Sequence, residues 1–249
     1  MRRKGEQGFT TILWDVDGTL LDFDYSMRAS LRKCFHTLGR TLTEDMVLRY
    51  SQINDGYWKR LERGEITKAQ LLTGRFRDFF REYEITGVDE TSFLREFQTG
   101  LGNNYAFEAD ALNTVKALQG HYRQYAVTNG VEATQRNKLN LSGLSEVMDG
   151  VFISEVIGCA KPGKDFFDYC LGQIGEKDKS RILIVGDSMT SDILGGIRAG
   201  IRTCWYNPGE RSHGFAYSAD YEISVLPQIY EVLGIWDPVS VDPDPVTGD

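Results

Sequence analysis

Short apolar runs that resemble β-strands alternate with helix-like segments along most of this 249-residue chain. We expect strands at residues 10–15, 123–128, 151–154, 181–186, 202–206 and 220–223. We expect the helices between them at residues 109–119, 132–141, 164–174, 191–199 and 226–233. Strands that alternate with helices are typical of a parallel sheet covered on both faces. The sequence therefore predicts an α/β fold with a doubly wound, Rossmann-like and mostly parallel sheet.

Residues 22–104 break this alternation. The segment is rich in Arg, Glu, Leu and Phe, and apolar residues such as Phe76, Phe79 and Phe80 recur at helical spacing. We interpret it as four or five helices inserted after the first strand, with Gly100 and Gly102 loosening the return connection. The expected domains are an α/β core (8–21 and 105–236), a helical cap (22–104) and a disordered tail (237–249) that is rich in proline and acidic residues.

The first strand ends on two carboxylates, in the run Trp14-Asp15-Val16-Asp17-Gly18-Thr19. Aspartate is depleted in strands, and two like charges one residue apart repel each other, so folding alone does not explain the pair. A bound divalent cation would explain it, because hard cations prefer oxygen ligands. A division of labour between a nucleophile and a proton donor would explain it equally well.

Three more polar groups follow predicted strands. They are Thr128-Asn129-Gly130, Lys161-Pro162 and the run from Gly186-Asp187 to Asp192. Each has a structural explanation when taken alone: a helix-capping turn, a surface lysine, or acids that complement a helix dipole. Open α/β sheets, however, bind ligands at the carboxyl ends of their strands. Four such groups at four strand ends therefore favour a shared site.

Composition narrows the possible partners. The formal net charge of −8 disfavours nucleic acid. The most notable apolar run, residues 182–185, is far too short to span a bilayer, and no apolar secretory segment follows the basic N-terminus. We therefore expect a cytoplasmic protein with no membrane partner. The four cysteines lack Cys-x-x-Cys spacing and are expected to be reduced thiols.

The four motifs, in this order, resemble the signature set of the haloacid dehalogenase superfamily over residues 9–233. An insertion between the first two motifs resembles the subgroup that carries a helical cap. The block 153–162 is similar to that subgroup's Ser-Glu-x-x-Gly-x-x-Lys-Pro element. Residues 185–207, together with Trp58, residues 64–67 and Arg75-Phe76, resemble the pyrimidine 5′-nucleotidase branch.

This resemblance implies phosphomonoester hydrolysis through an aspartyl-phosphate. Asp15 would be the nucleophile, and Asp17 the general acid and then the base for water. Lys161 would stabilise the transferring charge, and Thr128 with Asn129 would bind the remaining phosphate oxygens. The superfamily's dehalogenases lack an aspartate at the position of Asp17, so its presence favours phosphate esters.

The resemblance also implies Mg²⁺ as the cofactor. Its expected ligands are the Asp15 carboxylate, the Asp17 backbone carbonyl, Asp187, and Asp192 either directly or through water. The cation would turn an acidic cluster that repels phosphate into a phosphate site.

The resemblance implies that the cap selects the substrate and acts as a lid over the site. Asn54, Trp58 and Arg75 are the candidates to contact a base; alternatively, Trp58 belongs to the cap core and Arg75 to a surface ion pair. The expected substrate is a small phosphomonoester, namely a pyrimidine nucleoside monophosphate. Phosphoglycolate or a sugar phosphate, a phosphoryl-transferring mutase, and a non-catalytic binding protein remain alternatives. The protein is expected to be a monomer or a homodimer.

Overall fold

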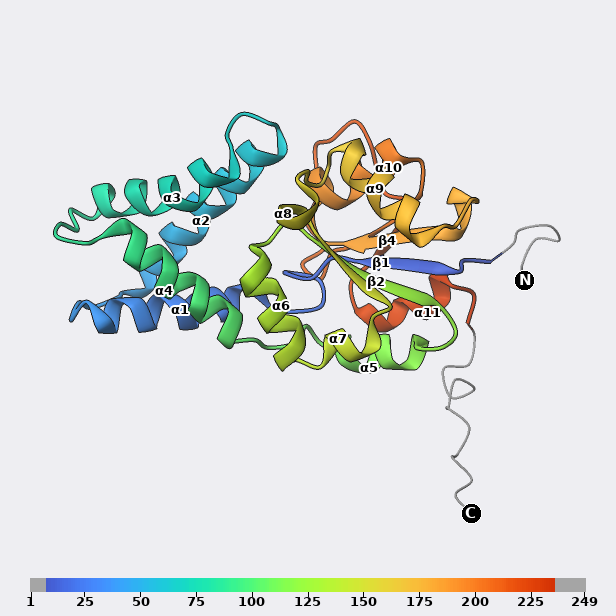
Figure 1. Ribbon diagram of the computed structural model, residues 1–249, viewed down its shortest axis with the longest axis horizontal. Helices are drawn as coiled ribbons and strands as arrows, with labels where there is room; N and C mark the ends of the chain where they lie inside the picture. The colour runs from blue at the N-terminus through green and yellow to red at the C-terminus, as the bar shows by residue number, and fades with distance from the viewer. Residues whose placement is uncertain (1–7, 236–249) are drawn as a thin grey trace, which may run out of the picture.

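A computed structural model describes residues 8–235 and contains a six-stranded sheet with helices on both faces (Figure 1). The strand order is β3-β2-β1-β4-β5-β6, and every neighbouring pair is parallel. The strands are β1 (Thr11–Trp14), β2 (Arg123–Thr128), β3 (Gly150–Ile153), β4 (Ile182–Gly186), β5 (Arg202–Tyr206) and β6 (Tyr221–Ile223). The predicted doubly wound α/β fold is confirmed.

Strand β1 lies at the centre of the sheet, between β2 and β4, and all four of its residues are buried. Ile12 and Trp14 pack into the core on one face, whereas Leu13 packs into the core on the other. Because side chains alternate along a strand, a strand covered on both faces is apolar at every position. This burial explains the unbroken apolar run before Asp15.

Helices α5 and α11 cover one face of the sheet, and α9 and α10 cover the other (Figure 1). The helices that follow the insertion are α5 (Ala111–Leu118), α6 (Glu132–Leu141), α7 (Leu144–Val147), α8 (Ser154–Ile157), α9 (Lys164–Ile174), α10 (Leu194–Ala199) and α11 (Ile229–Val232). Short 3₁₀ turns, η1 (Lys179–Arg181) and η3 (Leu226–Gln228), precede β4 and α11. The expected helices at 132–141 and 164–174 are confirmed to the residue.

The helix expected at 191–199 differs from the prediction at its start. It begins as a π-helical turn, η2 (Met189–Ile193), and continues as α10. The Ser188 side chain accepts a hydrogen bond from the Ser191 backbone N–H and caps this turn. Single π-helical turns are frequent at functional sites, and this one carries Asp192.

Residues 23–103 form four helices, which we call the helical insertion: α1 (Phe23–Thr37), α2 (Glu44–Glu62), α3 (Lys68–Glu82) and α4 (Glu90–Asn103). Each has an Asp or Thr at its N-cap whose side chain accepts from the first turn. The insertion has its own apolar cluster, in which the rings of Tyr50, Phe76 and Phe97 pack against one another. The division into core and cap at the predicted boundaries remains a proposal, and the tail 237–249 lies outside the described residues.

The expectation that Gly100 and Gly102 loosen the chain is wrong. Both lie within α4. A Cβ at Gly100 would lie 2.7 Å from the Ser30 Oγ atom of α1, and one at Gly102 would lie 3.4 Å from the Thr134 backbone of α6. Gly100 therefore allows close packing of α4 on α1, whereas a Cβ at Gly102 would make only ordinary contact with α6. Neither glycine acts as a flexible connection, because both lie within the helix.

The two connections between the helical insertion and the sheet lie beside each other. Leu21 and Phe107 form an antiparallel bridge, and the Asp22 N–H donates to the Ala106 carbonyl at 2.9 Å. The chain therefore leaves and rejoins the sheet at one point. Among residues 8–235, none of the helices combines the length and apolar character needed to cross a bilayer.

The parallel arrangement brings the carboxyl ends of all six strands to one edge of the sheet. Strand order reverses between β1 and β4, because the chain proceeds from β1 to β2 and β3 on one side and from β4 to β6 on the other. Ligands of open α/β sheets bind at such a switch point.

Candidate active site

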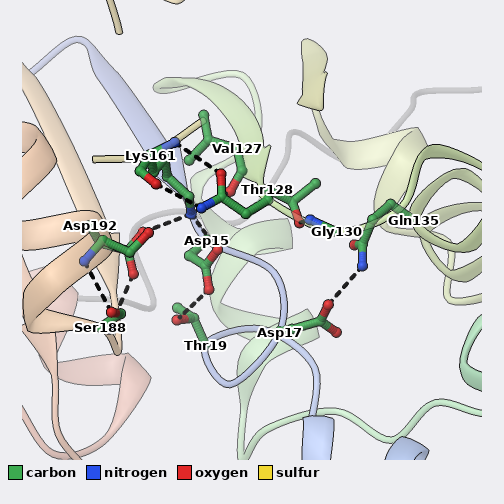
Figure 2. A network of polar contacts seen from close by, with 12 residues as sticks. Asp15, Asp17, Thr19, Val127, Thr128, Gly130, Gln135, Lys161, Ser188 and Asp192 are labelled. Atoms are coloured by element: carbon green, nitrogen blue, oxygen red, sulfur yellow. Dashed lines mark hydrogen bonds and ion pairs between the residues drawn. The ribbon is translucent and has the colours of Figure 1, made fainter. Parts of the chain in front are cut away.

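The Lys161 ammonium lies at the centre of the polar cluster at this sheet edge (Figure 2). Its Nζ atom lies 2.5 Å from Asp15 Oδ1 and 2.7 Å from Asp192 Oδ1, and it donates to the Val127 carbonyl at 2.9 Å. Lys161 is only 2% exposed, so these contacts are poorly screened by water. Three acceptors use all three donors of the ammonium group, which fixes its position beside Asp15.

The sequence places each of these groups through a strand or a turn. Asp15 directly follows β1, and Asp187 directly follows β4. Gly186 leaves room for the Asp192 carboxylate, which an added Cβ would overlap. Gly18 has φ +89°, and a Cβ there would lie 3.0 Å from the Asp187 carboxyl carbon. Gly18 and Gly186 thus allow the Asp187 and Asp192 carboxylates to lie close to the backbone.

Burial dominates the electrostatics of the cluster. Burial raises the pKa of Asp15, Lys161 opposes that rise, and the Asp192 and Asp187 carboxylates add to it. Burial and then Asp192 raise the pKa of Asp187 to about 7. Burial acts to lower the pKa of Lys161, but Asp15 and Asp192 outweigh it, so that pKa lies above its ordinary value. When all three carboxylates are ionised, the one ammonium leaves two negative charges uncompensated, which equals the charge of one divalent cation.

The geometry of the carboxylates fits a hard cation. One oxygen from each of Asp15, Asp187 and Asp192 lies within 4.8 Å of the other two. Carboxylate oxygens are the ligands that hard cations such as Mg²⁺ prefer, so these three side chains could hold one ion after local adjustment. The Asp17 side chain is not part of this triad.

Asp17 instead contacts helix α6. Its two carboxylate oxygens accept hydrogen bonds from Gln135 Nε2 at 2.7 Å and from Lys138 Nζ at 2.6 Å, and Figure 2 shows the Gln135 contact. Lys138 is fully buried, so this ion pair fixes the orientation of the Asp17 carboxylate. Gln135 and Lys138 were not predicted from the sequence; their i, i+3 spacing on a predicted helix was the available signal.

Thr128 and Asn129 lie at the end of β2 beside Lys161. Thr128 Oγ1 accepts from the Gly130 N–H at 3.0 Å, which leaves its own hydroxyl proton available to a ligand. The Asn129 side chain exchanges two hydrogen bonds of 2.9 Å with the Lys161 backbone. Asn129 thus also positions Lys161, a role not anticipated from the sequence.

A cavity of about 670 Å³ opens above this edge of the sheet, between it and the helical insertion. Asp15, Asp17 and Lys161 line it from the core side, and Asn54 and Trp58 line it from α2. The structure therefore brings these predicted site residues to one cavity. Arg75 does not line it. The structural alternative for Arg75, a surface ion pair, is wrong because this residue is 1% exposed.

The loop after β5 supplies a cavity wall that was not predicted. Arg211, His213 and Phe215 line the cavity there. Arg211 Nη2 donates to the Asp187 carbonyl at 3.2 Å, and Trp205 Nε1 donates to the same carbonyl at 2.9 Å. These contacts position Asp187. They depend on the path of an irregular loop, for which periodicity gives no signal.

Two residues of the helical insertion contact the loops at the carboxyl ends of the strands, one on each side of the cluster. Glu62 accepts from the Thr190 hydroxyl at 2.5 Å, and Lys68 donates to the Gly130 carbonyl at 2.6 Å. Burial raises the pKa of Glu62 to about 7, with a smaller opposing effect from its bond to Thr190. The turn between α2 and α3 therefore contacts the loops that follow both β2 and β4.

The parallel six-stranded sheet, with carboxylates at its switch point and a helical insertion above them, defines a doubly wound α/β protein with a candidate metal-assisted active site. Residues 9–200 match the family model of the haloacid dehalogenase-like hydrolases. The chain belongs to this family and is a hydrolase.

Three relatives are similar over most of the chain. The HAD-hydrolase YfnB of Bacillus subtilis is 35% identical over 93% of this chain and 98% of its own. The pyrimidine 5′-nucleotidase YjjG of Escherichia coli is 34% identical, with 89% and 96% covered. The pyrimidine 5′-nucleotidase PynA of Streptococcus pneumoniae is 33% identical, with 89% and 94% covered. A crystal structure of YfnB, described as bound to magnesium, matches with a TM-score of 0.87 and covers 92% of this chain and 100% of its own.

Proposed function

We propose that this protein is a Mg²⁺-dependent phosphomonoester hydrolase that acts on pyrimidine nucleoside 5′-monophosphates. The observation that carries the proposal is the presence of Asp15, Asp17 and Lys161 on one side of a single cavity. The cavity is within the size range of small-molecule sites. The names of YjjG and PynA support the choice of substrate, and the magnesium in the YfnB structure supports the choice of metal. A cytoplasmic location remains a prediction, as does a monomeric or homodimeric state.

In the proposed reaction, an Asp15 carboxylate oxygen attacks phosphorus. A phosphorus–oxygen bond to the nucleoside breaks as the bond to Asp15 forms, which gives an aspartyl-phosphate. Asp17 gives its proton to the leaving oxygen and then accepts a proton from the water that hydrolyses the aspartyl-phosphate. Gln135 and Lys138 each donate to one Asp17 oxygen, and each oxygen keeps a further lone pair that can carry the transferred proton.

The residues around Asp15 have complementary proposed roles. Lys161 stabilises negative charge on the phosphoryl oxygens, and the Thr128 hydroxyl and the Asn129 N–H bind the oxygens that remain. Asp15, Asp187, Asp192 and the Asp17 carbonyl hold Mg²⁺. The bound ion supplies charge neutralisation that lets a phosphate dianion approach four acidic side chains.

The helical insertion is proposed to act as a lid that excludes water and selects the leaving group. Trp58 offers an aromatic face and Asn54 an amide at the cavity. A pyrimidine base presents a π-face and ring carbonyls, so these two side chains match its chemistry. Arg75 contributes through Asn54, which it contacts directly.

A panel of phosphate esters, assayed for phosphate release with Mg²⁺, tests the proposal. We expect pyrimidine 5′-nucleotides to exceed ribose 5-phosphate and phosphoglycolate at least tenfold in kcat/KM. A preference for a sugar phosphate or for phosphoglycolate would replace the proposed substrate. Retention of the phosphoryl group on a product, without free phosphate, would identify a mutase.

Asp15→Asn tests the nucleophile. We expect kcat to fall by more than about 10³-fold, because an amide cannot form the aspartyl-phosphate. The melting temperature should change little, because the amide oxygen of the variant can still accept from Lys161, which keeps its ion pair with Asp192. Turnover within tenfold of wild type would contradict the assignment. Asp168→Asn, at an exposed ion pair with Lys164, is the matched control.

A further inference from the structure

Arg75 is a buried cation without an acidic partner among the described residues. Its guanidinium is 1% exposed within the helical insertion. Nη1 donates to Asn54 Oδ1 at 2.6 Å, whereas Nε and Nη2 have no partner. The guanidinium carbon lies 5.0 Å and 5.3 Å from the ring centroids of Phe76 and Phe97. Burying a charge without a counter-charge is costly, so packing alone is a poor reason to place arginine here.

The contact with Arg75 decides how Asn54 is oriented. A guanidinium group has only donors, so the amide of Asn54 must turn its oxygen toward Arg75. The amide nitrogen then lies on the other branch of the side chain. Asn54 is 5% exposed and lines the cavity. The group that Asn54 offers to a ligand is therefore the Nδ2–H donor, for which the described residues provide no acceptor.

Asn54 lies on a stripe of α2 that faces the cavity. Ser51, Asn54, Asp55 and Trp58 all line the cavity, and their spacing of i, i+3, i+4 and i+7 puts them on one helix face. Asp55 is already paired with Lys59 at 2.6 Å. A planar ring stacked on Trp58 would lie one helical turn from the Asn54 donor. The stripe thus offers a stacking surface and a hydrogen-bond donor to the same ring.

We propose that Asn54 selects the leaving group by donating from Nδ2 to a ring carbonyl oxygen, such as those of uracil and thymine, and that Arg75 is the positioning residue that fixes this orientation. The inference rests on the proposed nucleotidase function and adds the chemistry of recognition to it. The Arg75 charge also polarises the amide, because hydrogen bonds to charged groups strengthen those that follow in a chain.

Asn54→Asp is the most specific test because it preserves the shape of the side chain and removes the Nδ2–H donor. The new carboxylate would pair with Arg75, so the melting temperature should be unchanged or higher. We expect the ratio of kcat/KM for uridine 5′-phosphate to that for ribose 5-phosphate to fall at least tenfold. A purely structural role for Asn54 would leave this ratio unchanged, because the contact with Arg75 is kept.

Gln52→Glu is the matched control. It adds the same charge on the same helix at the same cavity, and Gln52 already accepts from Arg49 at 3.1 Å. In Gln52→Glu, the ratio of kcat/KM for uridine 5′-phosphate to that for ribose 5-phosphate should stay within twofold of wild type. Arg75→Met is the second variant: it frees the Asn54 amide to rotate, so KM for uridine 5′-phosphate should rise at least threefold while kcat changes less.

A measurement on the wild-type protein needs no substitution. Inhibition by uridine is compared with inhibition by the ribonucleoside in which benzene replaces uracil. We expect the carbonyl-free analogue to bind at least tenfold more weakly. Equal inhibition, or an unchanged ratio in folded Asn54→Asp, would overturn the inference and leave the nucleotidase proposal intact. Wild-type protein with no preference for nucleotides over ribose 5-phosphate would overturn the proposed function and this inference with it.

Discussion

The Lys161 ammonium contacts three segments that are distant in sequence: Asp15 after β1, the Val127 carbonyl in β2, and Asp192 in η2. One buried cation therefore holds two carboxylates that would otherwise repel each other. The same three contacts make the ammonium a fixed charge at the place where phosphate is proposed to bind. A preorganised charge of this kind needs no rearrangement when charge develops in a reaction.

The positions of Asp15 and Asp187 could be predicted because each directly follows a strand that periodicity identifies, whereas the short helix α8 separates Lys161 from β3. Parallel strands end at one edge, so a strand-end residue is placed by topology. The partners of Asp17 could not be predicted in this way. Lys138 is 121 residues from Asp17, and their contact depends on how α6 packs against the turn after β1.

Lys138→Met tests this unpredicted partner. We expect kcat to fall roughly 10–100-fold, since a misplaced catalytic group typically costs this much, while KM changes less than threefold. Arg136→Met removes an exposed cation that pairs with Glu132 on the same helix, and it should leave kcat unchanged. A kcat of Lys138→Met within twofold of wild type would show that Lys138 is only a structural residue.

The sequence correctly predicts helical structure in the region of α4 but gives the wrong role to the glycines of this helix. The sequence predicts helices across residues 22–104, and four are present. The sequence also predicts that Gly100 loosens the chain, and glycine in general disfavours helices. Close packing against Ser30 of α1 overrides that propensity, and such a contact between helices cannot be inferred from local sequence.

Gly100→Ala and Gly172→Ala should have opposite effects on stability. The Cβ at Gly100 would meet Ser30 at 2.7 Å, so overpacking should cost about 1–3 kcal/mol. Gly172 lies in α9 with no atom within 4 Å of an added Cβ, so alanine there should stabilise by about 0.5–1 kcal/mol. Urea denaturation measures both. A stable Gly100→Ala variant would show that α1 and α4 can separate.

At the scale of the whole molecule, the helical insertion contacts the α/β core through its two connections, through the packing of α4 on α6, and through Glu62 and Lys68. Glu62 has a pKa of about 7, above its ordinary value of 4.5. Its protonated form is therefore favoured in the folded state. The stability associated with Glu62 is complete below pH 4.5 and is lost as the pH rises to about 7.

Glu62→Gln removes the ionisable carboxyl group and so tests whether the pKa of Glu62 is raised in the folded protein. At pH 5 the variant and the wild type should melt at similar temperatures, because both carry a neutral side chain in the folded state. At pH 8 the variant should melt roughly 2–4 °C higher, the shift that about 1 kcal/mol produces in a domain of this size. Differential scanning calorimetry at both pH values, without metal, provides the comparison. A constant difference across pH would contradict the raised pKa.

Magnesium should stabilise the folded protein as a whole. At a concentration 100 times its Kd, a ligand specific for the native state adds about 2.7 kcal/mol. We therefore expect Mg²⁺ to raise the melting temperature by several degrees and EDTA to reverse this rise. Asp187→Asn should abolish most of the rise, whereas Asp168→Asn should not. A melting temperature of the wild type that is independent of Mg²⁺ would contradict the cation site.

The paired connections at Leu21 and Phe107 have a consequence for divergence within the family. Because the chain departs and returns at one point, residues 23–103 can be lengthened, shortened or exchanged without changing the register of any strand. Under the role proposed for the helical insertion, such changes would alter which molecules are accepted. The positions that contact the loops and helix α6 beside the carboxylates, such as Glu62, Lys68 and Gln98, should constrain this exchange, so new specificities are expected to evolve by remodelling the surfaces between them.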